Sequence, residues 1–187
     1  MGYDVLGNPV VIDLAAQPHL LLGGPPNSGK STGLQSVISS ISYNVSPQEV
    51  NFVLIDLGAN DLMSFGNLPH LACPVVRSQD EAIQAVAAVV AEMERRKDLE
   101  LANKQEFDVL PRLVLVIDEF PALFQCARNK RTSNSLRDMI SSLLQRGRHG
   151  KIHVVLAAQN PTYQKMKVDL GTAVGTTLKK RNKTLAL

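Results

Sequence analysis

Residues 24–31, Gly-Pro-Pro-Asn-Ser-Gly-Lys-Ser, have the types and spacing that bind a phosphate group. They fit the pattern GxxxxGK(S/T) at every defined position. An apolar strand pattern precedes them and a helical pattern follows. Glycines at the two ends of such a loop let backbone N–H groups turn inward around an anion at the start of a helix. An ordinary Gly/Pro turn is the alternative, and the flanking strand and helix count against it.

Each loop residue has an expected task toward a nucleotide. Lys30 can reach the β- and γ-phosphate oxygens, the Ser31 hydroxyl can ligate Mg²⁺, and Thr32 follows near the α-phosphate. Two prolines remove two backbone donors, but the amides closest to the β-phosphate follow them. The residues expected to bind ATP are Gly24, Pro25, Pro26, Asn27, Ser28, Gly29, Lys30, Ser31 and Thr32.

Two adjacent acids follow a second apolar run. Residues 113–117 are continuously apolar and lead directly into Asp118 and Glu119. In a parallel α/β sheet, ligands bind at the carboxyl ends of the strands. Asp118 is therefore expected to hold Mg²⁺ through its water shell, and Glu119 to orient and deprotonate the attacking water. The alternative is that both acids cap the next helix.

Two further polar residues end predicted strands at the same edge. Gln159 follows the run 152–158, and its amide can contact the γ-phosphate or the attacking water; a polar strand-end residue is the alternative. Asp56 ends the run 51–56. It is either a supporting partner of the site or a turn former, and the sequence leaves both open.

Short apolar runs alternate with longer helical patterns, which indicates an α/β fold with a mainly parallel sheet covered by helices. The half of the second helix from 92 to 100 is highly charged and is expected to protrude into solvent or to meet a partner. Beyond residue 171 no period is sustained. The expected strands are 19–23, 51–56, 113–117 and 152–158, and the expected helices are 30–42, 80–104 and one capped by Ser133 or Asn134 that ends at 146.

The composition favours one globular α/β domain. The chain has 187 residues, of which 44% are hydrophobic and 20% charged. No run approaches the roughly 20 apolar residues that span a bilayer, and no secretory signal pattern begins the chain. Cys73 and Cys126 form no CxxC motif, so reduced thiols are expected in preference to a disulfide or metal pair. A cytoplasmic location is the expectation.

The charge is uneven along the chain. Residues 160–187 carry six basic side chains and one acidic side chain, which leaves residues 1–159 at −2 out of the total of +3. The main body is therefore not a basic clamp for nucleic acid, and charge alone does not indicate DNA binding. We expect a domain over 1–170 and a basic, poorly ordered tail over 171–187.

Several segments together resemble the FtsK/SpoIIIE-type translocase ATPases of the HerA–FtsK group of P-loop ATPases. Their order and spacing match over roughly residues 4–165, and the match fades after Lys167, so the domain is expected to be C-terminally shortened. The phosphate loop alone would not separate this family from others, whereas Glu-Met-Glu-Arg-Arg at 92–96 and the segment ending in Gln-x-Pro do. The matching segments are 7–11, 18–21, 68–71, 92–96, 116–120 and 152–161.

The resemblance implies a three-layer RecA-like fold that works as a homo-oligomeric ring, commonly a hexamer, with ATP and Mg²⁺ between subunits. It also implies movement of double-stranded DNA in chromosome partition, sporulation or conjugative transfer, within a membrane-anchored or larger parent protein. An arginine that acts in trans is suggested as well. Arg148 is the first choice and Arg146 the second, against a solvated basic loop.

Three other functions remain open at this stage. A related motor of the same fold drives protein secretion of the type VII kind. A shortened module would bind nucleotide with little turnover. A metabolic kinase is the most distant alternative, because no arginine-bearing lid segment is evident.

Overall fold

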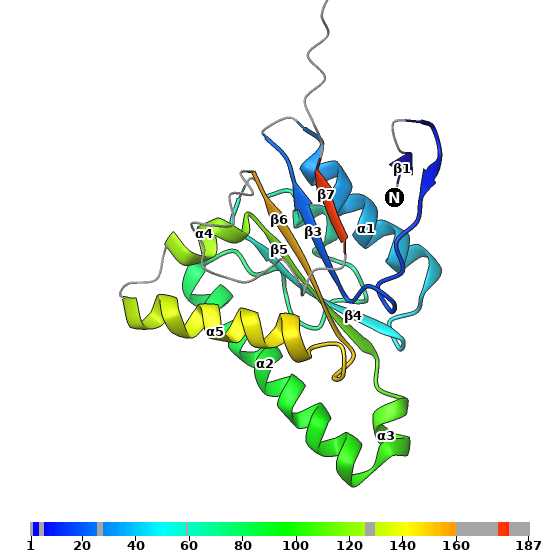
Figure 1. Cartoon of the computed structure of the whole chain (residues 1–187), viewed down its shortest axis with the longest axis vertical. Helices are drawn as coiled ribbons and strands as arrows, with labels where there is room; N and C mark the ends of the chain where they lie inside the picture. Colours follow the sequence, from blue (N-terminus) through cyan, green and yellow to red (C-terminus); the bar gives the residue numbers. More distant parts are fainter. Residues whose placement is uncertain are drawn as a thin grey trace, which may run out of the picture.

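The centre of the molecule is a five-stranded parallel sheet in the order β4-β5-β6-β3-β7 (Figure 1). The computed structural model describes residues 2–3, 6–25, 28–58, 60–125, 130–159 and 176–179, the first and last of these by their backbone alone. The strands of this sheet are β3 (His19–Gly23), β4 (Val50–Asp56), β5 (Arg112–Asp118), β6 (Ile152–Ala158) and β7 (Thr176–Lys179).

The sheet is apolar on both faces. In β5, Leu113, Leu115 and Ile117 pack into one core, whereas Val114 and Val116 pack into the other. Continuous apolar strands are typical of a parallel sheet that is buried on both sides. The predicted three-layer α/β fold is confirmed.

Helices cover the two faces unequally. Helix α1 packs on one face, and α2, α4 and α5 pack on the other (Figure 1). No helix among the described residues is long and apolar enough to cross a bilayer. The helices are α1 (Lys30–Asn44), η1 (Met63–Phe65), α2 (Gln79–Ala102), α3 (Lys104–Asp108), α4 (Phe120–Gln125) and α5 (Lys130–Arg146), and a small antiparallel hairpin joins β1 (Gly2–Tyr3) to β2 (Pro9–Val10).

The strand order brings distant segments to one edge. From β3 the chain passes to β4 at the far edge of the sheet and then returns through β5 and β6, so that β6 lies between β3 and β5. Because these strands are parallel, their carboxyl ends meet at the same edge. In open α/β sheets this is where ligands bind, next to the point at which the strand order reverses.

Two expected helix boundaries differ from the structure in a way that changes which residue caps a helix. Helix α5 begins at Lys130, so Asn134 lies inside it and accepts a hydrogen bond from Arg137 instead of capping the helix. The long charged helix ends at Ala102, and Asn103 caps the short helix α3 by accepting from the Glu106 amide.

A further difference is the strand β7 within the predicted tail. Four residues without any periodic pattern, 176–179, pair in parallel with β3, because backbone hydrogen bonds to an edge strand need no particular side chains. These four residues lie within the segment for which a basic, poorly ordered tail is expected. The other residues from 171 to 187 lie outside the described part, and the division of the chain at residue 170 stays a prediction.

Two buried histidines near the amino ends of β3 and β6 are held in the neutral form. The Val154 amide donates to His19 Nδ1 at 3.1 Å, and Arg112 Nη1 lies 3.3 Å from His153 Nε2. Both rings therefore accept a hydrogen bond. Burial, followed by the charge of His153 for His19 and of Arg112 for His153, lowers both pKa values from 6.5 to about 4.

These histidines should make the fold sensitive to mild acid. Between pH 6.5 and 4 the unfolded chain binds protons that the folded chain does not. The contribution of these histidines to the free energy of unfolding is therefore greatest above pH 6.5 and falls as the pH drops toward 4. We expect a loss on the order of 1–2 kcal/mol per histidine between pH 7.5 and 5. Urea unfolding at the two pH values measures it. The variant His153→Gln should flatten the dependence, whereas His149→Gln, at an exposed histidine, should not.

Candidate nucleotide-binding site at the carboxyl edge of the sheet

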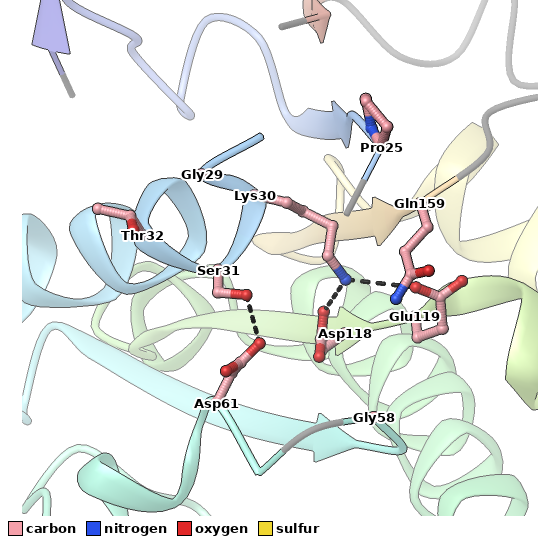
Figure 2. A pocket seen from close by; sticks show the side chains of 10 residues that line it. All are labelled: Pro25, Gly29, Lys30, Ser31, Thr32, Gly58, Asp61, Asp118, Glu119 and Gln159. Atoms are coloured by element: carbon pink, nitrogen blue, oxygen red, sulfur yellow. Dashed lines mark hydrogen bonds and ion pairs between the residues drawn. The ribbon is translucent and has the colours of Figure 1, made fainter. Parts of the chain in front are cut away.

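A pocket of about 510 Å³ lies at the carboxyl edge of the sheet, beside the N-terminal end of α1 (Figure 2). This volume lies within the range of small-molecule sites, roughly 300–1,000 Å³. Eight of its ten lining residues are ones that the sequence singles out, and Gly58 and Asp61 are additional. The lining residues are Pro25, Gly29, Lys30, Ser31, Thr32, Gly58, Asp61, Asp118, Glu119 and Gln159.

The loop before α1 has the geometry of an anion site. Gly29 has φ 81°, a left-handed conformation that glycine adopts without strain, and α1 begins at the next residue with no side-chain cap at Gly29. The first amides of the helix can therefore meet an anion. Ser28 Oγ is buried and has no hydrogen-bond partner within the described residues. Pro26 and Asn27 lie outside the described residues.

The structure brings the loop lysine and the acid pair together. Lys30 Nζ lies 2.5 Å from Asp118 Oδ1 and 3.3 Å from Glu119 Oε2 (Figure 2). The Asp118 side chain is 2% exposed, and that of Glu119 is 20% exposed. Both carboxylates therefore face the pocket and the lysine, which is not what a helix-capping role would require.

Glu119 has an unusual backbone. Its φ is 56°, in the left-handed region that non-glycine residues rarely adopt. Such conformations cost about 1–3 kcal/mol and cluster at functional sites. The turn aims the carboxylate at Lys30 directly after β5 ends, while the Glu119 carbonyl accepts from the Ala122 amide in α4.

The loop after β4 supplies two residues that the sequence analysis missed. Asp61 Oδ2 accepts a hydrogen bond from Ser31 Oγ. A Cβ on Gly58 would stand 2.9 Å from Asp118 Oδ2, so only glycine fits at that position without displacing the acid. The signal that could have found them is their position just beyond a predicted strand that ends at this edge.

Asp56 acts as a turn former. Its carboxylate accepts from the Leu62 amide at 2.9 Å and the Gly58 amide at 3.3 Å. These bonds fold the loop back toward α1, and Asp56 itself does not line the pocket. Gln159 follows β6 directly and lines the pocket opposite α1, with an exposed side chain (Figure 2).

Arg148 lies away from this pocket. It is exposed in the turn between α5 and β6, which is the amino edge of the sheet. Arg146, at the end of α5, pairs with Glu94 at 2.7 Å. Neither arginine is therefore brought to the pocket of its own chain.

The turn that carries Arg148 is anchored by Arg96. This residue is 4% exposed although it lies in the charged half of α2. Arg96 Nη1 donates to the carbonyl oxygens of Pro111 at 2.9 Å and Gly150 at 3.1 Å, and Nε donates to Glu92 at 2.7 Å. The expectation that this half of α2 faces only solvent or a partner is wrong for Arg96, because its guanidinium reaches inward to backbone carbonyls.

The parallel sheet, the glycine-lysine-serine loop between β3 and α1 and the acids that end β5 define a P-loop ATPase. The model of the FtsK/SpoIIIE family matches residues 1–107. The chain belongs to the FtsK/SpoIIIE family.

Curated relatives agree with this assignment. The chain is 37% identical over 181 residues to the DNA translocase FtsK of Lactiplantibacillus plantarum, and the match covers 87% of this chain and 22% of that protein. It is 34% identical over 194 residues to DNA translocase FtsK 1 of Neisseria meningitidis, with 87% and 23% covered. The chain thus spans less than a quarter of the length of these relatives.

Solved structures share the fold. EccC of Thermomonospora curvata (ATPases 2 and 3, in complex with a signal sequence peptide) has a TM-score of 0.77 at 28% identity, covering 93% of this chain and 33% of that one. The pCW3 conjugation coupling protein TcpA, a monomer form with ATPγS, has a TM-score of 0.67 at 23% identity, covering 83% and 46%. The second likeness concerns the fold alone.

Proposed function

We propose that this P-loop ATPase domain binds ATP with Mg²⁺ in the pocket and uses hydrolysis to move double-stranded DNA. The observation that carries the proposal is the contact of Lys30 with Asp118 and Glu119 at the start of α1. Membership in the FtsK/SpoIIIE family and relatives named DNA translocases support the DNA part.

The phosphates would lie where the loop amides and Lys30 converge. An anion at the start of α1 meets N–H groups and the positive end of the helix dipole. Lys30 would then exchange its carboxylate partners for β- and γ-phosphate oxygens, since its ammonium is a mobile point charge on a flexible stem. The proposed binding residues are the loop from Gly24 to Ser31, together with Thr32.

The pocket fits Mg²⁺. The side chains able to approach a cation, those of Ser31, Asp61 and Asp118, all offer oxygen, which this ion prefers. Among the described residues no group of three or more His, Cys, Asp or Glu side chains could hold an ion by itself. This suits Mg²⁺, which usually takes only one or two carboxylates besides waters and substrate phosphates. A bound Mg²⁺ would neutralise phosphate charge; we propose Ser31 and Asp118 as the residues that hold it.

Glu119 is the proposed general base. Its carboxylate is within the pocket and only partly exposed, so it can accept a proton from a water near the terminal phosphate. General-base catalysis contributes typically about 10²–10⁴-fold in rate. Gln159, on the other side of the pocket, would contact the γ-phosphate or hold that water.

Completion of the site would need a second copy of the chain. Arg148 is exposed at the sheet edge opposite the pocket, so it could only serve the nucleotide of a neighbour in a ring. An arginine supplied in this way raises the rate by roughly 10³–10⁵-fold. We propose a homo-oligomeric, hexameric ring with Arg148 as this group and Arg146 as the second choice. The ring would be cytoplasmic and part of a membrane-anchored or larger parent protein.

Protein secretion is the second candidate, because the EccC structure that shares the fold was determined with a signal sequence peptide. ATP turnover measured alone, with linear double-stranded DNA, and with an exported peptide separates the two. We expect several-fold stimulation by DNA and none by peptide, together with a higher oligomer by native mass measurement. Stimulation by peptide alone would favour secretion, and slow turnover insensitive to Glu119→Gln would favour a nucleotide-binding module.

A further inference from the structure

Asp61 is held in place by contacts on both sides of it. Gln35 Nε2, on α1, donates to the Asp61 carbonyl oxygen at 2.9 Å. The next residue, Leu62, is fully buried against α1, and its amide donates to Asp56. Because the backbone is held on both sides, the Asp61 side chain stays at the wall of the pocket (Figure 2).

Asp61 determines the direction of the Ser31 hydroxyl. A carboxylate can only accept hydrogen bonds, so the Ser31 proton points to Asp61 Oδ2. The lone pairs of Ser31 Oγ are then left for a cation. Asp118, by contrast, contacts Lys30, so the two aspartates face different partners across the pocket.

The charges that line the pocket do not balance. Asp61, Asp118 and Glu119 face a single lysine, Lys30, which gives a net formal charge of −2. A nucleoside triphosphate without metal would be repelled by this excess, whereas a divalent cation would neutralise it. Like-charge repulsion in a partly buried site is screened less by salt than on an open surface.

We propose that Asp61 is the positioning residue of the divalent-cation site, which orients Ser31 as a ligand and makes the pocket select the metal complex of ATP over free ATP. This rests on the proposed function of the pocket. Asp61 would thus make the pocket discriminate between free ATP and the metal complex of ATP. A purely structural role of the loop would not produce this preference.

The test is the affinity of the full chain for a fluorescent ATP analogue, measured with Mg²⁺ and with EDTA. For Asp61→Asn we expect affinity to fall about 10–100-fold with Mg²⁺, the range for losing one charge-assisted interaction, and to stay equal or rise with EDTA. Asp61→Glu, which keeps the charge, should retain most of the metal preference. Asp98→Asn, at an exposed aspartate on α2, should behave as the parent chain.

A second readout follows the metal itself. The affinity for Mn²⁺, measured by electron paramagnetic resonance in the presence of ATP, should fall in Asp61→Asn by a similar factor. Equal losses of nucleotide affinity with Mg²⁺ and EDTA would overturn the inference, as would an Asp61→Glu variant with the same low preference as Asp61→Asn.

The inference and the proposed function can fail separately. A parent chain that binds no nucleotide in either condition would contradict the proposed function and the inference with it. A parent chain with a clear preference for the metal complex, matched by an equal preference in Asp61→Asn, would contradict the role of Asp61 alone.

Discussion

Replacing Lys30 with alanine should lower the affinity for ATP by at least about a hundredfold, since each charge-assisted hydrogen bond lost is worth about 1.5–3 kcal/mol. The two carboxylates that remain in the pocket add to this loss of affinity. Without the lysine, Asp118 and Glu119 face an incoming phosphate with no compensating cation. Equilibrium titration with a fluorescent ATP analogue in Mg²⁺ measures the change.

The control for this variant is Lys97→Ala, at an exposed lysine on α2 far along the chain from the loop. It should leave the affinity unchanged. Because Asp118 is almost fully buried, thermal unfolding of Lys30→Ala must first establish that the variant is folded. A folded Lys30→Ala chain with the affinity of the parent would refute the assignment of the loop.

Replacing Glu119 with glutamine should keep ATP bound while slowing hydrolysis by about 10²–10⁴-fold, the typical contribution of a general base. The amide has nearly the same shape as the carboxylate and can still meet Lys30, so the left-handed turn before α4 has no new steric demand. The substitution also removes a negative charge from the pocket, so it adds no electrostatic repulsion toward the anionic nucleotide.

Single-turnover hydrolysis and ATP titration on the same preparation separate the two quantities. Glu81→Gln, in the first turn of α2, is the matched control and should turn over as the parent does. A Glu119→Gln chain as fast as the parent would mean that another group takes the proton. A chain that loses both binding and turnover would point to a structural role for this residue.

The parts of the site that are local in sequence could be predicted. The phosphate loop and the Asp118–Glu119 pair each lie within a few residues of a strand whose apolar pattern is unmistakable. Because parallel strands end at the same edge, the two segments could be expected to meet, although 88 positions separate Lys30 from Asp118. Their contact is found in the structure, and their catalytic roles stay predictions.

The parts that depend on how loops fold back could not be predicted. Asp61 reaches Ser31 only because Asp56 captures the Leu62 amide and turns the loop toward α1. Arg96 lies on the same face of α2 as the buried Met93, but its helical position does not reveal that it donates to the carbonyl of Gly150, which lies 54 positions away in sequence. The partners in these two contacts cannot be identified from composition or periodicity.

The predicted start of α5 was wrong for a related reason. Ser133 and Asn134 have side chains that often cap helices, but a cap is decided by where the backbone begins to turn. Here α5 starts at Lys130, before both of them. Strand β7 was missed because an edge strand is held by backbone hydrogen bonds, which any short sequence without proline can supply.

The most direct measurement is a structure of the chain with Mg²⁺ and a non-hydrolysable ATP analogue. We expect the phosphates at the N-terminal end of α1, Lys30 Nζ moved from Asp118 to the terminal phosphates, and Mg²⁺ beside Ser31 with Asp118 in its water shell. An analogue bound elsewhere on the molecule, or one bound here while Lys30 stays paired with Asp118, would contradict the proposal that these residues form one ATP site.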